Sequence, residues 1–308
     1  MSVTPEWPSH VTLVEVGPRD GFQVERTFIP TDRKLAIIGG LVGAGLRHVQ
    51  VASFVHPGRV PQMADAEAIC AALLPDAPAD VAYSGLVLNL KGVERALASG
   101  LRILDVSIAP DEGQSQSNAG MSVADARAQA RAMIARARQA GCTVHAGLQV
   151  VFGYRTPGDV PLDRVIEMAR ELAESGAHTV SLADSTGMGD PRTVERTVAA
   201  LRDAVGDVPL VLHLHDTRGM GLANVVAGLR AGVTRFDTSL GGMGGCPFIA
   251  GATGNIPTDD TAHMLARMGI DTGVDVAAVG ALARELEAFL GKRFDGKLHA
   301  LPARDAAS

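Results

Sequence analysis

The sequence contains a pair of histidines whose spacing could hold a metal ion. His213 and His215 lie in the apolar run Leu210-Val211-Leu212-His213-Leu214-His215-Asp216. Because successive side chains of a β-strand point to opposite faces, both imidazoles would share one face and the leucines the other. Two imidazoles on one face can chelate a divalent ion, although an isolated pair is often just two satisfied polar residues near a strand end. The pair therefore indicates metal chemistry only if other strands bring further ligands.

Strand-like and helix-like segments alternate along most of the chain. The eight predicted units are Val11–Val16 with Thr31–Ala44, His48–Ala52 with Met63–Leu73, Val81–Leu88 with Gly92–Ala98, Ile103–Ile108 with Val123–Ala140, Thr143–Val151 with Leu162–Glu174, His178–Leu182 with Pro191–Ala204, Leu210–His215 with Leu222–Ala231, and Arg235–Ser239 with Thr258–Met268. Strands without a polar face indicate a parallel sheet covered by helices, and eight units favour a closed (β/α)8 TIM barrel. The alternative is an open doubly wound sheet, but no G-x-G-x-x-G follows the first strand.

The pattern predicts one domain. Residues 1–10 form an N-terminal extension, and residues 11–297 form the barrel with an extra C-terminal helix within Asp271–Leu290. That amphipathic helix must pack outside the barrel or on a neighbouring subunit. Residues 298–308 are rich in alanine and polar residues, which predicts a frayed tail.

Composition restricts the class of protein. The 308 residues carry a net charge of −6 without a basic stripe, which argues against nucleic acid as a partner. No apolar run reaches the roughly 18 residues that suggest a membrane span, and the N-terminus has no secretion-signal pattern. Three cysteines are too few for a disulfide framework. We expect a cytoplasmic protein with no membrane partner.

Polar residues gather where the predicted strands end, which in a TIM barrel is the active-site face. They are Arg19 and Asp20 with Glu15 just before them, Gln50 and Ser53, Asp111, Glu112, Ser115 and Asn118, Asp184, the two histidines, and a glycine-dense loop from Gly241 to Pro247 that leads to Asn255. Carboxylate, imidazole and amide oxygen ligands suit Mg²⁺ or Mn²⁺. The set lacks the thiolates of a structural zinc site.

Several motifs resemble those of the 3-hydroxy-3-methylglutaryl-CoA lyase family, which belongs to a wider group of metal-dependent TIM-barrel lyases and condensing enzymes. The motifs are Glu15-Val16-Gly17-Pro18-Arg19-Asp20-Gly21-Phe22-Gln23, Ser53-Phe54-Val55, Val60-Pro61-Gln62-Met63-Ala64-Asp65, His213-Leu214-His215-Asp216-Thr217, and Gly244-Gly245-Cys246-Pro247-Phe248 with Gly254-Asn255. They are long and occur in the family's order. The resemblance covers about residues 10–290.

The resemblance implies a role for each matching position. The implied metal ligands are Asp20, His213, His215 and Asn255, the implied catalytic residues are Arg19, Asp184, His213, Cys246 and Glu15, and the candidate substrate-binding residues are Gln23, Gln50, Ser53, Ser115 and Asn118. It also implies a Mg²⁺ or Mn²⁺ cofactor and a CoA thioester substrate. A homodimer is a further expectation from the family and the extra helix.

These roles agree with the chemistry of cleaving the C2–C3 bond of a 3-hydroxyacyl thioester. The C3 hydroxyl must lose its proton, which a divalent ion would favour and which Asp184 or His213 could accept. The guanidinium of Arg19 suits the enolate that departs, although it could instead be a structural ion-pair partner. Cys246 could protonate the enolate or help to close the site. It could also be a small buried side chain, but neighbouring glycines and a proline favour function.

One residue and two segments depart from the family pattern. Gln50 stands where these lyases usually carry a glutamate, Tyr154-Arg155-Thr156-Pro157 replaces the usual Cys-Pro-Tyr-Glu, and Pro110–Asn118 lacks the usual aromatic, lysine-rich loop. We expect the reaction type to be preserved and leave the acyl group open. The main hypothesis is cleavage of hydroxymethylglutaryl-CoA to acetyl-CoA and acetoacetate. The alternatives are a related lyase, aldolase or carbon–carbon hydrolase with another acyl group, such as a citramalyl-CoA lyase, a Claisen-type synthase, and a non-catalytic binding barrel.

Overall fold

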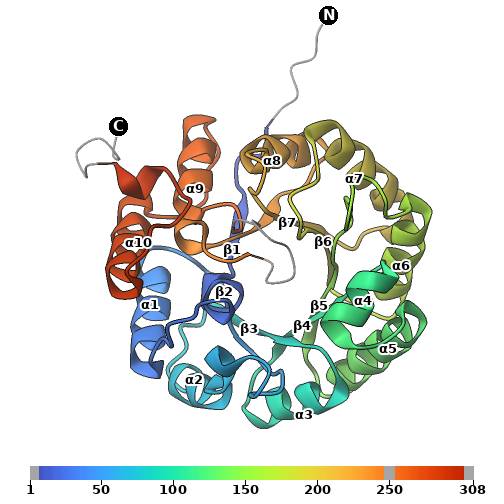
Figure 1. The fold of residues 1–308 in the computed structure, drawn as a ribbon, viewed down its shortest axis with the longest axis horizontal. Helices are drawn as coiled ribbons and strands as arrows, with labels where there is room; N and C mark the ends of the chain where they lie inside the picture. Colours follow the sequence, from blue (N-terminus) through green and yellow to red (C-terminus); the bar gives the residue numbers. More distant parts are fainter. Residues whose placement is uncertain (1–6, 246–253, 302–308) are drawn as a thin grey trace, which may run out of the picture.

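The computed structural model describes residues 7–245 and 254–301, and its strands form a closed parallel barrel (Figure 1). Each strand pairs with the next, and β8 pairs in parallel with β1 to close the sheet. The strands are β1 (Thr12–Glu15), β2 (His48–Ser53), β3 (Ala82–Val87), β4 (Ile103–Ile108), β5 (Thr143–Leu148), β6 (Thr179–Asp184), β7 (Leu210–Leu214) and β8 (Arg235–Thr238). The predicted TIM barrel is confirmed.

Helices surround the barrel, as Figure 1 shows. They are α1 (Thr31–Gly43), α2 (Ala66–Leu73), α3 (Leu90–Ala98), α4 (Glu112–Ala119), α5 (Val123–Gln139), α6 (Leu162–Glu174), α7 (Pro191–Val205), α8 (Gly221–Arg230), α9 (Thr258–Arg267) and α10 (Val276–Leu290). All eight predicted strand–helix units are present, with bounds that differ from the predicted ones by a few residues. None of the helices in the described part of the chain has the length and apolarity needed to cross a membrane.

Several short elements at the carboxyl end of the barrel were not predicted, and two of them follow β1 and β4. One is η1 (Gly17–Gly21), a single turn of π-helix whose sequence, with a proline in its first turn, suggests only a turn. The other is α4, whose polar sequence EGQSQSNA has no apolar face to produce helical periodicity. The side chain of Asp111 caps its N-terminus by accepting from Gln114 N, and Gly120 ends it with a φ of 71°.

The C-terminal segment is more ordered than its composition suggested. Helix α10 packs against α1 and α9 outside the barrel. Residues Leu298–Ala300 form a 3-10 turn, η4, in which His299 is buried against α9 and α10. The prediction that fraying begins at residue 298 is therefore wrong for residues 298–301, because His299 finds two carboxylate partners. Residues 302–308, like residues 1–6, lie outside the described part.

Candidate active site and metal centre

A cavity of about 820 Å³ opens at the carboxyl end of the barrel. It is lined by residues that follow several strands, among them Arg19 after β1, Ser185 after β6 and His215 after β7. Side chains on the inner face of the strands, such as Asp105 and Ser181, form its floor. The cavity thus lies where the active site of a TIM barrel is expected.

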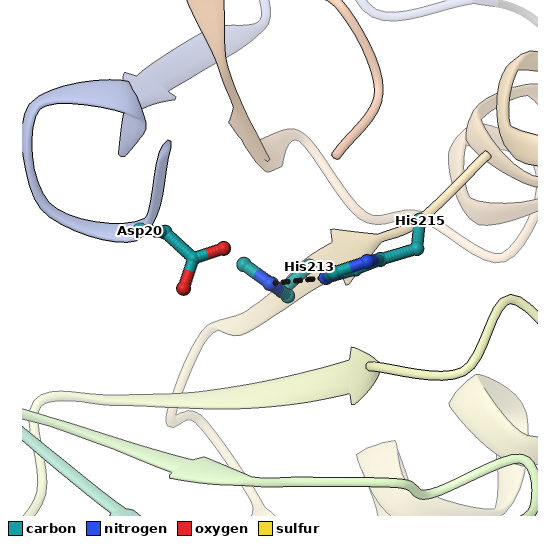
Figure 2. A group of neighbouring side chains, drawn as sticks. All are labelled: Asp20, His213 and His215. Carbon is teal, nitrogen blue, oxygen red and sulfur yellow. Dashed lines mark hydrogen bonds between the residues drawn. The ribbon is translucent and has the colours of Figure 1, made fainter. Parts of the chain in front are cut away.

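Three potential metal ligands meet in this cavity. Asp20 comes from η1, while His213 and His215 come from the end of β7, and Figure 2 shows the three side chains side by side. One ligand atom from each lies within 4.8 Å of the others, and the Nε2 atoms of the two histidines are 3.2 Å apart. All three residues are buried. The expectation that the His-x-His pair shares one face with a carboxylate nearby is confirmed.

Asn255 lies next to this cluster. Its Nδ2 donates to Asp20 Oδ2 at 2.8 Å and to the carbonyl of Met243 at 3.0 Å. Its Oδ1 is buried and has no hydrogen-bond partner within the part of the chain that the structure describes. A buried amide oxygen without a donor is costly, so an ion would satisfy it. The carboxylate, imidazole and amide donors fit a divalent ion such as Mg²⁺ or Mn²⁺.

Gly244 makes room for this arrangement. A Cβ at this position would lie 2.5 Å from Asn255 Nδ2 and 3.3 Å from Asp20 Oδ2, and the backbone has a φ of +120°. Both facts favour glycine, since any side chain would push the amide away from the carboxylate. The glycine-dense loop after β8 therefore helps to form the site.

Arg19 lies against the cluster. Its guanidinium donates to Asp20 Oδ1 and to Gln50 Oε1, and Gln23 Nε2 donates to the same Asp20 oxygen at 2.9 Å. Burial alone would raise the pKa of the Asp20 carboxyl, but the charge of Arg19 and the neighbouring imidazoles lower it to about 2. Asp20 is thus ionised at neutral pH, as a metal ligand must be.

Asp184 does not lie where it was expected. Ser181 and Ala183 line the cavity, so the alternation along β6 turns Asp184 outward, toward the helices. Its two oxygens accept from the backbone N–H groups of Met188 and Gly189, at 2.8 and 2.9 Å. Burial raises the pKa of Asp184 to about 6, although these hydrogen bonds oppose the rise. In this structure Asp184 holds the loop after β6 and does not line the cavity.

Glu15 also faces away from the cavity. It is fully buried and accepts from Gly17 N at 2.8 Å, Leu240 N at 2.9 Å and Thr258 Oγ1 at 2.6 Å. Burial raises its pKa to about 7, despite these hydrogen bonds. The carboxyl group joins η1 to the segment after β8 and to α9, so it supports the turn that carries Arg19 and Asp20.

The candidate substrate-binding residues divide into two groups. Gln23, Gln50 and Asn118 line the cavity, and Asn118 Nδ2 donates to Gln149 Oε1 at 3.0 Å. Ser53 is buried and does not line it, while Ser115 Oγ donates to the Met121 carbonyl and holds the end of α4. Cys246 lies outside the described residues.

Several polar residues that the sequence analysis did not single out line the cavity as well. They are Asp105, Ser107, His145, Gln149 and Asp237. Asp237 Oδ2 lies 3.1 Å from His213 Nδ1 and orients this imidazole. A signal for them is present in the sequence, because β4, β5 and β8 carry polar residues at every second position, as in Arg235-Phe236-Asp237. These strands therefore do not lack a polar face, contrary to the expectation.

The closed barrel and the ligand cluster at its carboxyl end define a TIM-barrel protein with a candidate divalent-metal centre. The HMGL-like family model matches residues 10–285, and the chain belongs to this family. Membership places it among the carbon–carbon lyases of the hydroxymethylglutaryl-CoA lyase type.

Similar proteins match over nearly their whole length. A 3-hydroxy-3-isohexenylglutaryl-CoA/hydroxy-methylglutaryl-CoA lyase of Pseudomonas aeruginosa is 39% identical over 92% of this chain and 94% of the relative. An (R)-citramalyl-CoA lyase of Chloroflexus aurantiacus is 34% identical over 92% of each chain. The structure of an HMG-CoA lyase from Acinetobacter baumannii in complex with coenzyme A and 3-methylmalate superposes on this chain with a TM-score of 0.90. The two chains are 34% identical, and the match covers 96% of each.

Proposed function

We propose that this protein cleaves the C2–C3 bond of a 3-hydroxyacyl-CoA, in the simplest case hydroxymethylglutaryl-CoA to acetyl-CoA and acetoacetate. The proposal rests on one observation, the cluster of four potential metal ligands: Asp20, His213, His215 and Asn255. The Arg19 guanidinium lies in the same cavity. Asp20, the two histidines and Asn255 would hold Mg²⁺ or Mn²⁺. Such an ion, when bound, supplies Lewis acidity to the C3 hydroxyl.

Arg19 provides the positive charge for the leaving enolate. Its side chain is only 11% exposed and is fixed by two acceptors, Asp20 Oδ1 and Gln50 Oε1. A guanidinium held in place before the reaction stabilises developing negative charge without reorganisation. Because Gln50 is neutral, it orients Arg19 without cancelling its charge. We assign Arg19 to enolate stabilisation and Gln50 to its orientation.

His213 was expected both to bind the metal ion and to accept a proton, and both roles would use its Nε2 atom. Asp237 engages Nδ1, so only Nε2 is left for the ion, and a coordinated Nε2 has no lone pair for a proton. We therefore assign His213 to the ion. Asp184 would serve as the base only if the loop after β6 turned its carboxylate into the cavity. Proton donation to the enolate carbon is assigned to Cys246, on the resemblance of the loop that carries it.

A related lyase with another acyl group is the second candidate. Its support is the set of departures from the family pattern in the cavity wall, Gln50 above all, and the similarity to the C. aurantiacus citramalyl-CoA lyase. A Claisen-type synthase would use the same site to form the bond. Product analysis distinguishes the three, because a synthase would need a keto acid and an acyl-CoA together.

The test is a product assay by mass spectrometry with purified enzyme. Hydroxymethylglutaryl-CoA, citramalyl-CoA and longer branched analogues are each supplied with Mg²⁺ or Mn²⁺, with or without EDTA. We expect acetyl-CoA and a keto acid from at least one thioester, abolished by EDTA and restored by either metal. Absence of cleavage with every thioester, or cleavage insensitive to the chelator, would refute the proposal. Turnover of hydroxymethylglutaryl-CoA alone would refute an altered acyl group.

We further infer the setting in which the enzyme works. A CoA thioester is the ligand, a view supported by the coenzyme A complex of the A. baumannii enzyme. The net charge of −6 does not favour nucleic acid, and we propose a cytoplasmic enzyme that forms a homodimer. Size-exclusion chromatography with light scattering tests the dimer.

A further inference from the structure

The floor of the cavity is polar. It is formed by Asp105 and Ser107 of β4, His145 of β5, Gln149 just after β5, and Ser181 of β6. Asp105 and His145 are neighbours in the parallel pairing of β4 with β5. The same cavity contains His213 and His215, so the floor and the metal centre open into one space.

Most polar groups of the floor already have partners. Gln149 Nε2 donates to Ser107 Oγ at 2.9 Å, and Gln149 Oε1 accepts from Asn118 at 3.0 Å. His145 Nδ1 lies 2.6 Å from Thr179 Oγ1. These contacts fix the side chains and leave little capacity for a ligand.

Asp105 differs from Ser107, His145 and Gln149. Across residues 7–245 and 254–301 no hydrogen bond or ion pair to its carboxylate is found, and its Oδ2 is a buried acceptor without a donor. The Arg235 guanidinium interacts electrostatically with Asp105, but it donates its hydrogen bond to His48 Nδ1. A carboxylate at a cavity wall is an acceptor only, and leaving it without a donor is costly once a ligand displaces water.

Leu86 and His145 flank Asp105 on the neighbouring strands, and the next inward-facing layer toward the carboxyl ends consists of small residues. In that layer Ser107 pairs with Gly147, and Gly147 pairs with Ser181. A hydrocarbon group there would remove water from Asp105 without replacing its hydrogen bonds. An anionic group would be repelled by Asp105 and by Asp237, which also lines the cavity, because the single Arg235 guanidinium offsets only part of the charge of these two carboxylates.

We propose that Asp105 is a specificity-determining residue that accepts a hydrogen bond from a donor, such as a hydroxyl, on the C3 substituent of the acyl group. The substrate class is then a 3-hydroxyacyl-CoA with a short polar substituent at C3. A hydrocarbon branch of equal size is disfavoured relative to such a polar group, and hydroxymethylglutaryl-CoA, with a methyl group there, is a substrate that lacks this hydrogen bond. This inference rests on the proposed function and adds the identity of the acyl group.

The experiment compares two substrates of equal size, 3-hydroxy-3-(hydroxymethyl)glutaryl-CoA and 3-ethyl-3-hydroxyglutaryl-CoA. A hydrogen bond to a charged acceptor contributes about 1.5–3 kcal/mol, so kcat/KM of the wild type should favour the hydroxymethyl substrate by about 10- to 150-fold. Asp105→Ala should bring this ratio toward one, and Asp105→Asn should lower it less. Asp203→Asn, the same charge change on the exposed face of α7, is the matched control and should keep the wild-type ratio.

The experiment distinguishes failure of the Asp105 proposal from failure of the proposed lyase function. A wild-type ratio near one, a preference for the ethyl substrate, or an unchanged ratio in Asp105→Ala overturns the role of Asp105 even if hydroxymethylglutaryl-CoA is cleaved. If no thioester is cleaved, the proposed function fails.

The role of Asp105 is then tested by binding. The ligands are the 3-deoxy forms of the hydroxymethyl and ethyl thioesters, which cannot be cleaved. Tighter binding of the hydroxymethyl compound, lost in Asp105→Ala, supports the subsite, and equal binding overturns it. Circular dichroism of each variant verifies folding.

Discussion

The carboxylate of Asp237 holds the imidazole of His213, with Oδ2 lying 3.1 Å from Nδ1. Because Nδ1 carries the proton shared with this carboxylate, the Nε2 lone pair of His213 is directed into the cavity, 3.2 Å from Nε2 of His215. The carboxylate comes from β8 and the imidazole from β7, which pair with His213 opposite Asp237. The register of β7 and β8 thus orients the His213 imidazole for metal binding in the absence of an ion.

Removing the charge of Asp237 should weaken metal binding. In Asp237→Asn the amide no longer stabilises the Nδ1–H tautomer, and we expect the affinity for Mn²⁺ to fall about 10- to 100-fold. Calorimetric titration with Mn²⁺ measures this directly. Asp203→Asn, on the outer surface, should bind as the wild type does. An unchanged affinity in Asp237→Asn would show that the hydrogen bond has no part in metal binding.

Loss of His215 should remove both metal and activity. We expect His215→Ala to lose tight Mn²⁺ binding and thioester cleavage together, since a centre with one imidazole fewer cannot retain the ion. His10→Ala alters an exposed histidine outside the cavity and serves as the control. If tight binding persists in His215→Ala, the ligand assignment is wrong.

Asp184 should act on stability more than on proton transfer. In Asp184→Asn one backbone N–H of Met188 or Gly189 would face an amide donor, which we expect to lower the free energy of unfolding by about 1–3 kcal/mol. A base with a pKa of about 6 would produce an acidic limb in the profile of kcat/KM against pH. We expect that limb, if present in the wild type, to persist in Asp184→Asn. Its disappearance would identify Asp184 as the base.

Cys246 lies beyond the described residues, so its role is tested by kinetics alone. If the thiol donates a proton to the enolate carbon, Cys246→Ser should reduce turnover by orders of magnitude and leave Mn²⁺ affinity unchanged. Cys70→Ser, in the buried core at α2, is a matched thiol-to-hydroxyl control and should affect stability alone. Normal turnover in Cys246→Ser would assign the residue to loop packing.

His299 should make stability depend on pH. The hydrogen bond to Asp259 Oδ2, 3.0 Å long, raises the pKa of His299, assisted by the charges of Asp259 and Glu287 and opposed by burial. A folded-state pKa above the unfolded value means that the stabilisation is complete below about pH 6.5 and is lost as pH rises through the folded pKa. Urea unfolding between pH 6 and pH 9 should show this decline. In His299→Gln the decline should be smaller, and an identical decline would contradict the assignment.

Much of the fold could be predicted from local patterns. Apolar strands followed by amphipathic helices and then glycine recur along the chain, and these properties depend on short-range backbone geometry. The spacing of His213 and His215 also placed both imidazoles on one face before any tertiary contact was known. The turn η1 escaped prediction, because a π-helical turn has no pattern of its own.

Sequence by itself determined the class of fold, the pairing of the histidines and the candidate ligands, because each depends on residue type and near neighbours. Tertiary structure decided which face of each strand lines the cavity. Both faces of a barrel strand are buried, so Asp184 could be assigned to the outer face only once Ser181 and Ala183 were seen inside. The tertiary structure also brought Asn255 to Asp20 across 235 residues and, among the residues it describes, left Asp105 Oδ2 without a donor. Contacts between residues so far apart follow from closure of the barrel, which no local pattern encodes.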